Sequence, residues 1–136
     1  MRHLFIVLLA GLLGACASTP VPPHNPQMAW VELFTRTGEL VMADRLDGKR
    51  LDDGRYFQVT PGAHELRIRF DYRVSYGSLW NDPQNRTCYL RVRYHDFKAG
   101  QVYRLEGWVL GVEPEARLQD ANQQIIADDD QESCMF

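Results

Sequence analysis

The chain has 136 residues, of which 15 are basic and 18 are acidic, so its formal net charge at neutral pH is −3. This length suits a single domain once an N-terminal leader is set aside. A mildly acidic chain has no bulk attraction for nucleic acid, and we expect no nucleic-acid partner.

The N-terminal residues are predicted to be a targeting segment. Arg2 and His3 precede an apolar run at 4–13, which is too short to cross a bilayer as a mature helix. The run ends in Leu13-Gly14-Ala15-Cys16, which resembles the lipobox of bacterial lipoproteins. The alternative is an ordinary secretory signal with an incidental cysteine.

The lipoprotein resemblance implies that residues 1–15 are a signal peptide and that Cys16 is lipidated and becomes the mature N-terminus. Ala17, rather than an aspartate, follows the cysteine, which in that family usually implies the outer membrane, with the domain facing the periplasm. Acyl chains, palmitate among them, would anchor the chain firmly, because each buried methylene contributes about 0.8 kcal/mol.

Removal of residues 1–15 would leave 14 basic and 18 acidic residues, a formal charge of −4. With Cys16 committed to lipid, Cys88 and Cys134 remain. An even pair of cysteines in an oxidising compartment predicts a disulfide, which would fasten the C-terminal tail to a central strand. The alternative is two free thiols.

Residues 16–27 are predicted to be a tether. Four prolines in this short span keep the backbone extended and without a hydrogen-bonding pattern of its own. We interpret the tether as a spacer that holds the domain off the membrane surface. His24 lies within it and is interpreted as polar filler.

The remaining residues, 28–136, are predicted to form one all-β domain. Outside the leader no segment shows an apolar period of 3.6 residues, and turn signals such as Asp47-Gly48 and Pro61-Gly62 recur at short intervals. The expected strands are 28–34, 39–46, 55–60, 63–75, 88–95, 102–110, 116–120 and 123–128. About seven or eight short strands are typical of a small antiparallel β-sandwich or barrel, and we expect a sandwich.

The clearest pattern is the strict alternation that follows Pro61-Gly62. One side of the predicted strand is apolar: Leu66, Ile68, Phe70, Tyr72 and Val74. The other side is charged: Glu65, Arg67, Arg69, Asp71 and Arg73. Residues 88–95 alternate in the same way, with Cys88, Leu90, Val92 and Tyr94 on one side and Tyr89, Arg91, Arg93 and His95 on the other. A period of two is what a half-buried strand requires.

Two segments also resemble a known family. The stretches VTPGAHELRIRF (59–70) and FKAGQVYRLEG (97–107), preceded by an Asp-Gly turn, resemble the PEGA-type surface domains and related uncharacterised lipoprotein domains. The resemblance covers roughly residues 39–110, and its motifs encode turns and strands rather than chemistry. It implies a small β-sandwich used for surface display or contact, with no common reaction.

Five arginines are expected to share one sheet face. If 63–74 and 88–95 pair, the face carries Arg67, Arg69, Arg73, Arg91 and Arg93, with cross-strand neighbours about 5 Å apart. Guanidinium groups suit carboxylates and phosphates, so this face could bind lipopolysaccharide phosphates, peptidoglycan carboxylates or an acidic protein. The alternative, which we favour, is internal neutralisation. The acids that could supply it are Glu65, Asp71, Asp128, Asp129, Asp130 and Glu132.

A second candidate surface is the predicted loop at 76–87. It presents Tyr76, Leu79 and Trp80, and exposed loop aromatics are common binding hot spots. The equally weighted alternative is that Trp80 covers the open end of the sandwich.

No catalytic constellation stands out. His64 and His95 lie on different predicted strands, and no metal-ligand spacing occurs, so we expect no metal, no cofactor and no enzymatic activity. The sequence favours a lipid-anchored binding or accessory module of the cell envelope, whose partner is an envelope protein or an anionic glycan or lipid. The alternatives are a periplasmic enzyme inhibitor, a lipid-carrying sandwich with an apolar cavity, and an enzyme with a dispersed site.

Overall fold

A computed structural model describes residues 18–77 and 82–135 of the chain, without the side chains of Gln131 and Glu132. These residues form nine β-strands and no helix. The strands are β1 (Ala29–Thr35), β2 (Leu40–Leu46), β3 (Lys49–Arg50), β4 (Tyr56–Val59), β5 (Gly62–Val74), β6 (Gln84–Phe97), β7 (Val102–Leu110), β8 (Glu113–Gln119) and β9 (Ile125–Met135). The predicted all-β fold is confirmed. The strand that the sequence missed is β3, which has only two residues.

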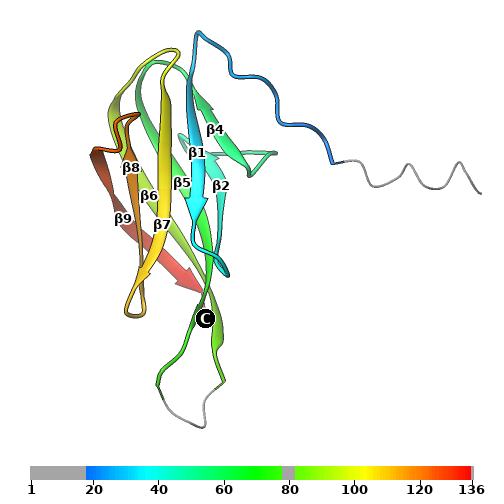
Figure 1. Cartoon of the computed structure of the whole chain (residues 1–136), viewed down its shortest axis with the longest axis vertical. Coiled ribbons are helices and arrows are strands. Elements are labelled where there is room, and N and C mark those ends of the chain that lie inside the picture. The colour runs from blue at the N-terminus through cyan, green and yellow to red at the C-terminus, as the bar shows by residue number, and fades with distance from the viewer. Residues whose placement is uncertain (1–17, 78–81, 136) are drawn as a thin grey trace, which may run out of the picture.

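The nine strands form one continuous sheet in the order β3-β2-β5-β6-β9-β8-β7-β1-β4 (Figure 1). Strand β9 joins the two layers, because Ile125–Asp128 pairs with β8 and residues 129–135 pair with β6. The ladders are antiparallel except for β1 and β7, which run parallel. The sandwich is therefore mixed, and a search for hairpins alone does not predict the β1–β7 pairing.

The buried core follows the alternation. The five apolar side chains of β5 are at most 2% exposed, whereas the charged residues between them are half-buried or exposed. On β6, Cys88, Leu90 and Val92 are fully buried, but Tyr94 is only half-buried. The Tyr94 ring lies near the end of the core, edge-on to the Phe97 ring at a centroid distance of 5.0 Å.

The two layers come into direct contact at Gly107 of β7. A Cβ atom at this position would lie 2.7 Å from Cγ2 of Val41 in β2 and 3.6 Å from the Phe70 ring in β5. Near the other end of the interior, the rings of Phe97 and Tyr103 meet edge to face at 5.0 Å. Side chains of both layers thus fill the space between them.

Two strands are longer than the sequence predicts. Strand β6 begins at Gln84, inside the predicted loop, so the β5–β6 hairpin extends beyond the other strands (Figure 1). The acidic tail also lies in a strand, since β9 continues to Met135. Among the residues that the structure describes, no helical stretch has the length and hydrophobicity that a bilayer crossing requires.

Candidate functional site

The predicted arginine face forms on the outer side of the β5–β6 hairpin. The register places Arg67 opposite Arg91, Arg69 opposite Tyr89, and Glu65 opposite Arg93. Like charges that face each other across a ladder destabilise a sheet, so Arg67 and Arg91 need nearby carboxylates.

Two carboxylates lie beside Arg91 and Arg93. Oδ2 of Asp130, on β9, lies 2.8 Å from Nη1 of Arg93 and 3.3 Å from Nη2 of Arg91. Oε2 of Glu65 accepts a hydrogen bond of 2.9 Å from Nε of Arg93. This is the internal neutralisation that the sequence analysis favoured, with Asp130 as the acid that the tail contributes.

The other two tail acids with described side chains do not join this face. Oδ1 of Asp129 accepts a hydrogen bond of 2.7 Å from the backbone N–H of Ala116, and partial burial raises the pKa of this carboxyl. Asp128 is in register with Arg117 on β8, in the other layer. Alternation along β9 turns Asp129 away from the arginine face, and Asp128 lies where β9 pairs with β8, so Asp130 alone of these three acids reaches that face.

Arg67 and Arg69 also have acidic neighbours. Nε of Arg67 lies 3.1 Å from Oδ2 of Asp44, and its guanidinium lies over the Tyr89 ring, 4.5 Å from the centroid. Nε of Arg69 donates to Asp71 at 3.0 Å, and this hydrogen bond raises the pKa of Arg69. Asp44 was not foreseen, because it lies where the register between β2 and β5 shifts. Four of the five arginines thus have carboxylate partners.

The disulfide fixes the strand that supplies Asp130. Cys88 and Cys134 lie directly opposite each other on β6 and β9, are covalently linked, and have Cα atoms 4.0 Å apart. The predicted Cys88–Cys134 bridge is therefore present. It holds the C-terminal half of β9 against β6, next to the arginine face.

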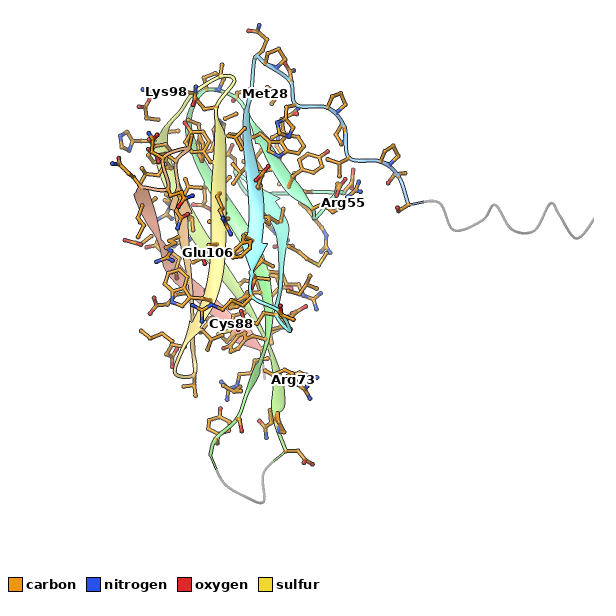
Figure 2. All side chains as sticks on the ribbon, viewed as in Figure 1. Met28, Arg55, Arg73, Cys88, Lys98 and Glu106 are labelled. Carbon is orange, nitrogen blue, oxygen red and sulfur yellow. A yellow bond between two sulfur atoms is a disulfide. The ribbon has the colours of Figure 1, made fainter. Side chains whose placement is uncertain are left out.

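Arg73, the fifth arginine, differs from the others by its position. Strand β2 begins at Leu40, opposite Asp71, so no β2 residue pairs with Arg73 near the end of β5. Arg73 is exposed, and within the described residues it makes no ion pair. Figure 2 shows Arg73 at one end of the molecule and Lys98 at the other.

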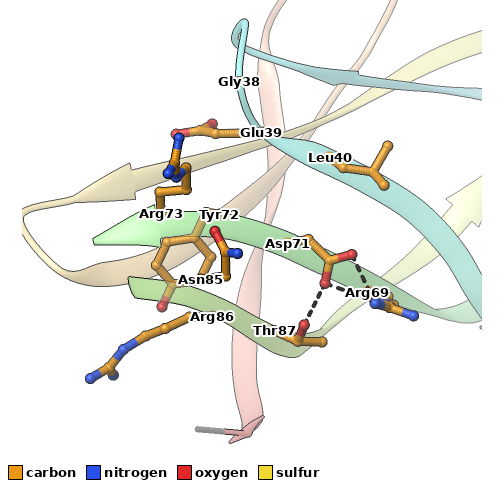
Figure 3. Close-up of a pocket in the computed structure, with 10 residues that line it drawn as sticks. All are labelled: Gly38, Glu39, Leu40, Arg69, Asp71, Tyr72, Arg73, Asn85, Arg86 and Thr87. Atoms are coloured by element: carbon orange, nitrogen blue, oxygen red, sulfur yellow. Dashed lines mark hydrogen bonds and ion pairs between the residues drawn. The ribbon is translucent and has the colours of Figure 1, made fainter. Parts of the chain in front are cut away.

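A surface hollow of about 380 Å³ lies beside Arg73. Its lining includes Arg73, Asn85, Arg86, Glu39 and Asp71, and Figure 3 draws the Arg73 and Glu39 side chains near each other, with Asp71 beside Arg69 and Thr87. Asp71 is already engaged, because it accepts hydrogen bonds from Arg69 and from Oγ1 of Thr87. The hollow therefore offers guanidinium and amide donors to an incoming acceptor group, with the Glu39 carboxylate at its rim.

Tyr76 and Arg86 extend this surface along the hairpin. Arg86 donates a hydrogen bond to the Tyr76 hydroxyl, and its guanidinium lies 5.5 Å from the centroid of the Tyr76 ring. The Tyr76 side chain is 47% exposed. The predicted contact residues Leu79 and Trp80 lie outside the described residues, as does the predicted lipidation site, Cys16. The term "hairpin end" is used below for Arg73, Tyr76, Asn85 and Arg86.

Tyr72 packs the base of the hairpin against the sandwich. This side chain is buried, its hydroxyl donates to the carbonyl of Val112 at 3.3 Å, and it lies 3.4 Å from Sγ of Cys88. Burial raises the pKa of the Tyr72 phenol. The base of the projecting hairpin is thus packed against the sandwich and the disulfide.

The histidine of the family-like motif has a structural role that the sequence analysis did not foresee. Nδ1 of His64 lies 2.6 Å from Oδ2 of Asp47, and Nε2 donates to the Thr60 carbonyl at 2.8 Å. Asp47 has a positive φ of 49°, and its carboxylate also accepts from the N–H of Glu65. His64 thus ties the turn after β2 to the start of β5.

The described residues contain no group of three or more His, Cys, Asp or Glu side chains arranged to hold a metal ion. No protein-family model, curated protein or solved structure matches this chain. The function proposed below therefore rests on the residues of this chain.

Proposed function

We propose that this chain is a non-enzymatic binding module of the bacterial cell envelope. In this proposal, Cys16 carries the lipid that anchors the chain in the outer membrane, and the domain faces the periplasm. The LGAC sequence at 13–16, at the end of a short apolar run, supports the anchor. The hairpin end is the contact surface for an anionic envelope component or an acidic partner protein.

One observation carries the choice of surface. Arg67, Arg69, Arg91 and Arg93 each lie within 4.0 Å of a carboxylate of the domain itself, whereas Arg73 makes no ion pair among the described residues. A guanidinium that already has a carboxylate partner must give up that contact to bind another anion. Arg73 can bind an anion without losing such a contact, so we place the contact surface at the hairpin end rather than across the whole arginine face.

The aromatic ring and the hollow add to this surface. An exposed tyrosine next to an arginine is a combination that is enriched in binding hot spots. A planar guanidinium can form two parallel hydrogen bonds to one carboxylate or phosphate. Because these charges are exposed, salt should weaken the binding, since the Debye length is only about 8 Å at physiological ionic strength.

The packed interior does not favour the lipid-carrier alternative. A carrier needs an apolar cavity between its layers, but Gly107 already lies within van der Waals reach of Val41 and Phe70. Large side chains such as Phe57, Phe70 and Phe97 are fully buried between the layers.

A binding assay with defined envelope components tests the proposal. The lipidated full-length chain is sedimented with purified peptidoglycan sacculi and, separately, with lipopolysaccharide, as wild type, Arg73→Glu and Lys98→Glu. Both substitutions change the charge equally at exposed positions at opposite ends of the molecule (Figure 2). We expect Arg73→Glu to lose about tenfold in affinity for the component that binds, which corresponds to about 1.4 kcal/mol.

The Lys98→Glu control should bind as the wild type does. If Arg73→Glu binds as tightly as the wild type, the hairpin end is not the contact surface. If the wild type binds neither component and captures no envelope protein after cross-linking, the binding-module proposal is wrong.

A further inference from the structure

The tether is not a free spacer, because its second half is packed on the domain. The His24 ring stacks on the Trp30 indole with centroids 4.0 Å apart and planes 22° apart. Trp30 in turn stacks on Tyr56 of β4 at 4.2 Å, with planes 12° apart. Trp30 is only 5% exposed, although it lies on the outer side of β1. The interpretation of His24 as polar filler is therefore wrong.

Hydrogen bonds fasten both ends of this segment. At its start, Nη1 of Arg55 donates a hydrogen bond of 2.8 Å to the carbonyl of Thr19. Nη2 of the same guanidinium lies 2.7 Å from Oδ2 of Asp53. At its end, the N–H of Gly100 donates to the carbonyl of Met28 at 2.9 Å. We call residues 18–28 the strap, because they are tied to the domain at both ends and by a ring stack between them.

The strap leaves little free chain next to the predicted lipid. Cys16 precedes Thr19 by three residues, and a fully extended chain covers at most about 3.6 Å per residue, so their Cα atoms are at most about 11 Å apart. The headgroup layer of one leaflet is itself roughly 5–8 Å thick, by the difference between total and hydrocarbon thickness. This limit holds for every conformation of residues 16–18.

The surface next to Thr19 is the loop before β4. Ser18 and Thr19 line a hollow of about 500 Å³ together with the loop residues Asp52, Asp53, Gly54 and Arg55. Asp52 and Asp53 carry negative charges, and the positive charge of Arg55 is paired with Asp53, so the loop presents both signs of charge with an excess of one acid. A surface of mixed charge suits phospholipid headgroups, which carry a phosphate and, in phosphatidylethanolamine, an ammonium group.

We propose that the strap seats the domain directly on the bilayer, with the loop Asp52–Arg55 at the phospholipid headgroups. The inference rests on the proposed lipidation of Cys16. The hairpin end is a different surface from this contact. Gly54 of the loop lies beside Met42 of β2, which pairs with Arg69, and Arg73 lies four residues further along β5, roughly 14 Å away along the strand.

Fluorescence quenching on the lipidated full-length chain tests this orientation. Asp52→Cys and Ala121→Cys are labelled with bimane in nanodiscs of three parts phosphatidylethanolamine to one part phosphatidylglycerol. Both positions are exposed, but Ala121 lies in the β8–β9 turn, on the side of the molecule away from the start of the strap at Thr19 (Figure 1). A nitroxide on a small fraction of the lipid headgroups should quench the label at 52 at least about threefold more strongly than the label at 121, because the chain limit keeps position 52 near the headgroups.

Two further variants separate the strap from the anchor. Insertion of ten Gly and Ser residues after Ala17 adds a flexible segment of roughly 18 Å and should reduce quenching at position 52 to the level at 121. His24→Ala combined with Arg55→Ala should have the same effect by releasing the strap. Strong quenching at 52 that survives both changes would show that the strap does not set the orientation, and would overturn the inference.

Mass spectrometry of the N-terminal peptide shows whether Cys16 carries lipid. Equal quenching at 52 and 121 in a chain that carries lipid on Cys16 overturns the seating of the domain and leaves the anchor intact. A chain without lipid on Cys16 overturns the anchor and this inference together. The first result leaves the proposed function unaffected. The second overturns its anchor but not the contact at the hairpin end, which the Arg73→Glu comparison tests on the chain with or without lipid, so the two contacts fail separately.

Discussion

Gly107 shows how closely a single residue can limit the packing of the two layers. A Cβ atom there would lie 2.7 Å from Cγ2 of Val41, which is closer than atoms pack in protein interiors. We expect Gly107→Ala to lower the free energy of unfolding by about 1–3 kcal/mol, the usual cost of overpacking a core. Urea unfolding of both proteins at neutral pH measures this difference in the free energy of unfolding. In the double variant with Val41→Ala the two losses should not add, because each substitution relieves the other. Additive losses would contradict this account of the contact.

The carboxylate of Asp47 links the stability of the fold to pH. Partial burial acts to raise the pKa of its carboxyl, but the hydrogen bond from the Glu65 N–H and the contact with His64 outweigh burial, and the pKa is lowered. A carboxyl with a lowered pKa stabilises the fold above its unfolded pKa, and this stability is lost as the pH falls through the folded value.

The wild type should therefore lose stability on acidification below about pH 4 partly through Asp47. Asp47→Asn cannot titrate, so its urea midpoint should fall less than that of the wild type between about pH 5 and pH 3. If the urea midpoints of the wild type and of Asp47→Asn fall equally as the pH is lowered, the protonation of this carboxylate is not coupled to folding.

At the scale of elements, β9 depends on the Cys88–Cys134 bridge. The bridge closes a loop with a sequence separation of 46, and the chain-entropy account assigns such a loop about 4 kcal/mol. We expect Cys88→Ala with Cys134→Ala to lower the free energy of unfolding by about that amount. The comparison variant, Arg91→Ala with Arg93→Ala, should cost about 1 kcal/mol or less per exposed ion pair. A double cysteine variant as stable as the wild type would contradict this role of the bridge.

The elements that the sequence predicts are those with a local signal. The period of two in β5 and β6 identifies both strands and their buried sides, and an even pair of cysteines identifies the disulfide. The second half of β9 has no such signal, because three consecutive aspartates have low strand propensity. It is a strand because Asp129 accepts a hydrogen bond from Ala116, Asp130 lies between two arginines, and Cys134 is bonded to β6.

The candidate site also depends on contacts that have no local signal in the sequence. Arg73 continues the pattern of Arg67 and Arg69, and only the start of β2 at Leu40 separates it from them. The stack of His24 on Trp30 joins residues six positions apart through a turn at Asn25-Pro26. The dipeptide signals a turn, but it does not say which rings the turn brings together. Pattern alone therefore finds the charged face, but tertiary structure decides which arginine on it makes no ion pair with the described residues.

At the scale of the whole molecule, the proposals assign different tasks to separate surfaces of the sandwich. The strap and the loop Asp52–Arg55 lie next to the predicted lipid, and the hairpin end lies where β5 and β6 extend beyond the other strands (Figure 1). In this arrangement the surface that binds the partner and the surface at the anchor are separate. The disulfide and Tyr72 support the base of the hairpin, so Arg73, Asn85 and Arg86 are presented by paired strands, and Tyr76 follows directly after β5.

Site-specific photo-crosslinking in cells that express the lipidated chain tests the central claim most directly. A photoreactive phenylalanine replaces Tyr76 at the hairpin end, and in a matched chain replaces Ile125, which is similarly exposed on β9. We predict an adduct from position 76 that is absent from position 125 and is lost when Arg73→Glu is added. The same adducts from both positions, or none from position 76, would contradict the claim that the hairpin end is the contact surface of this protein.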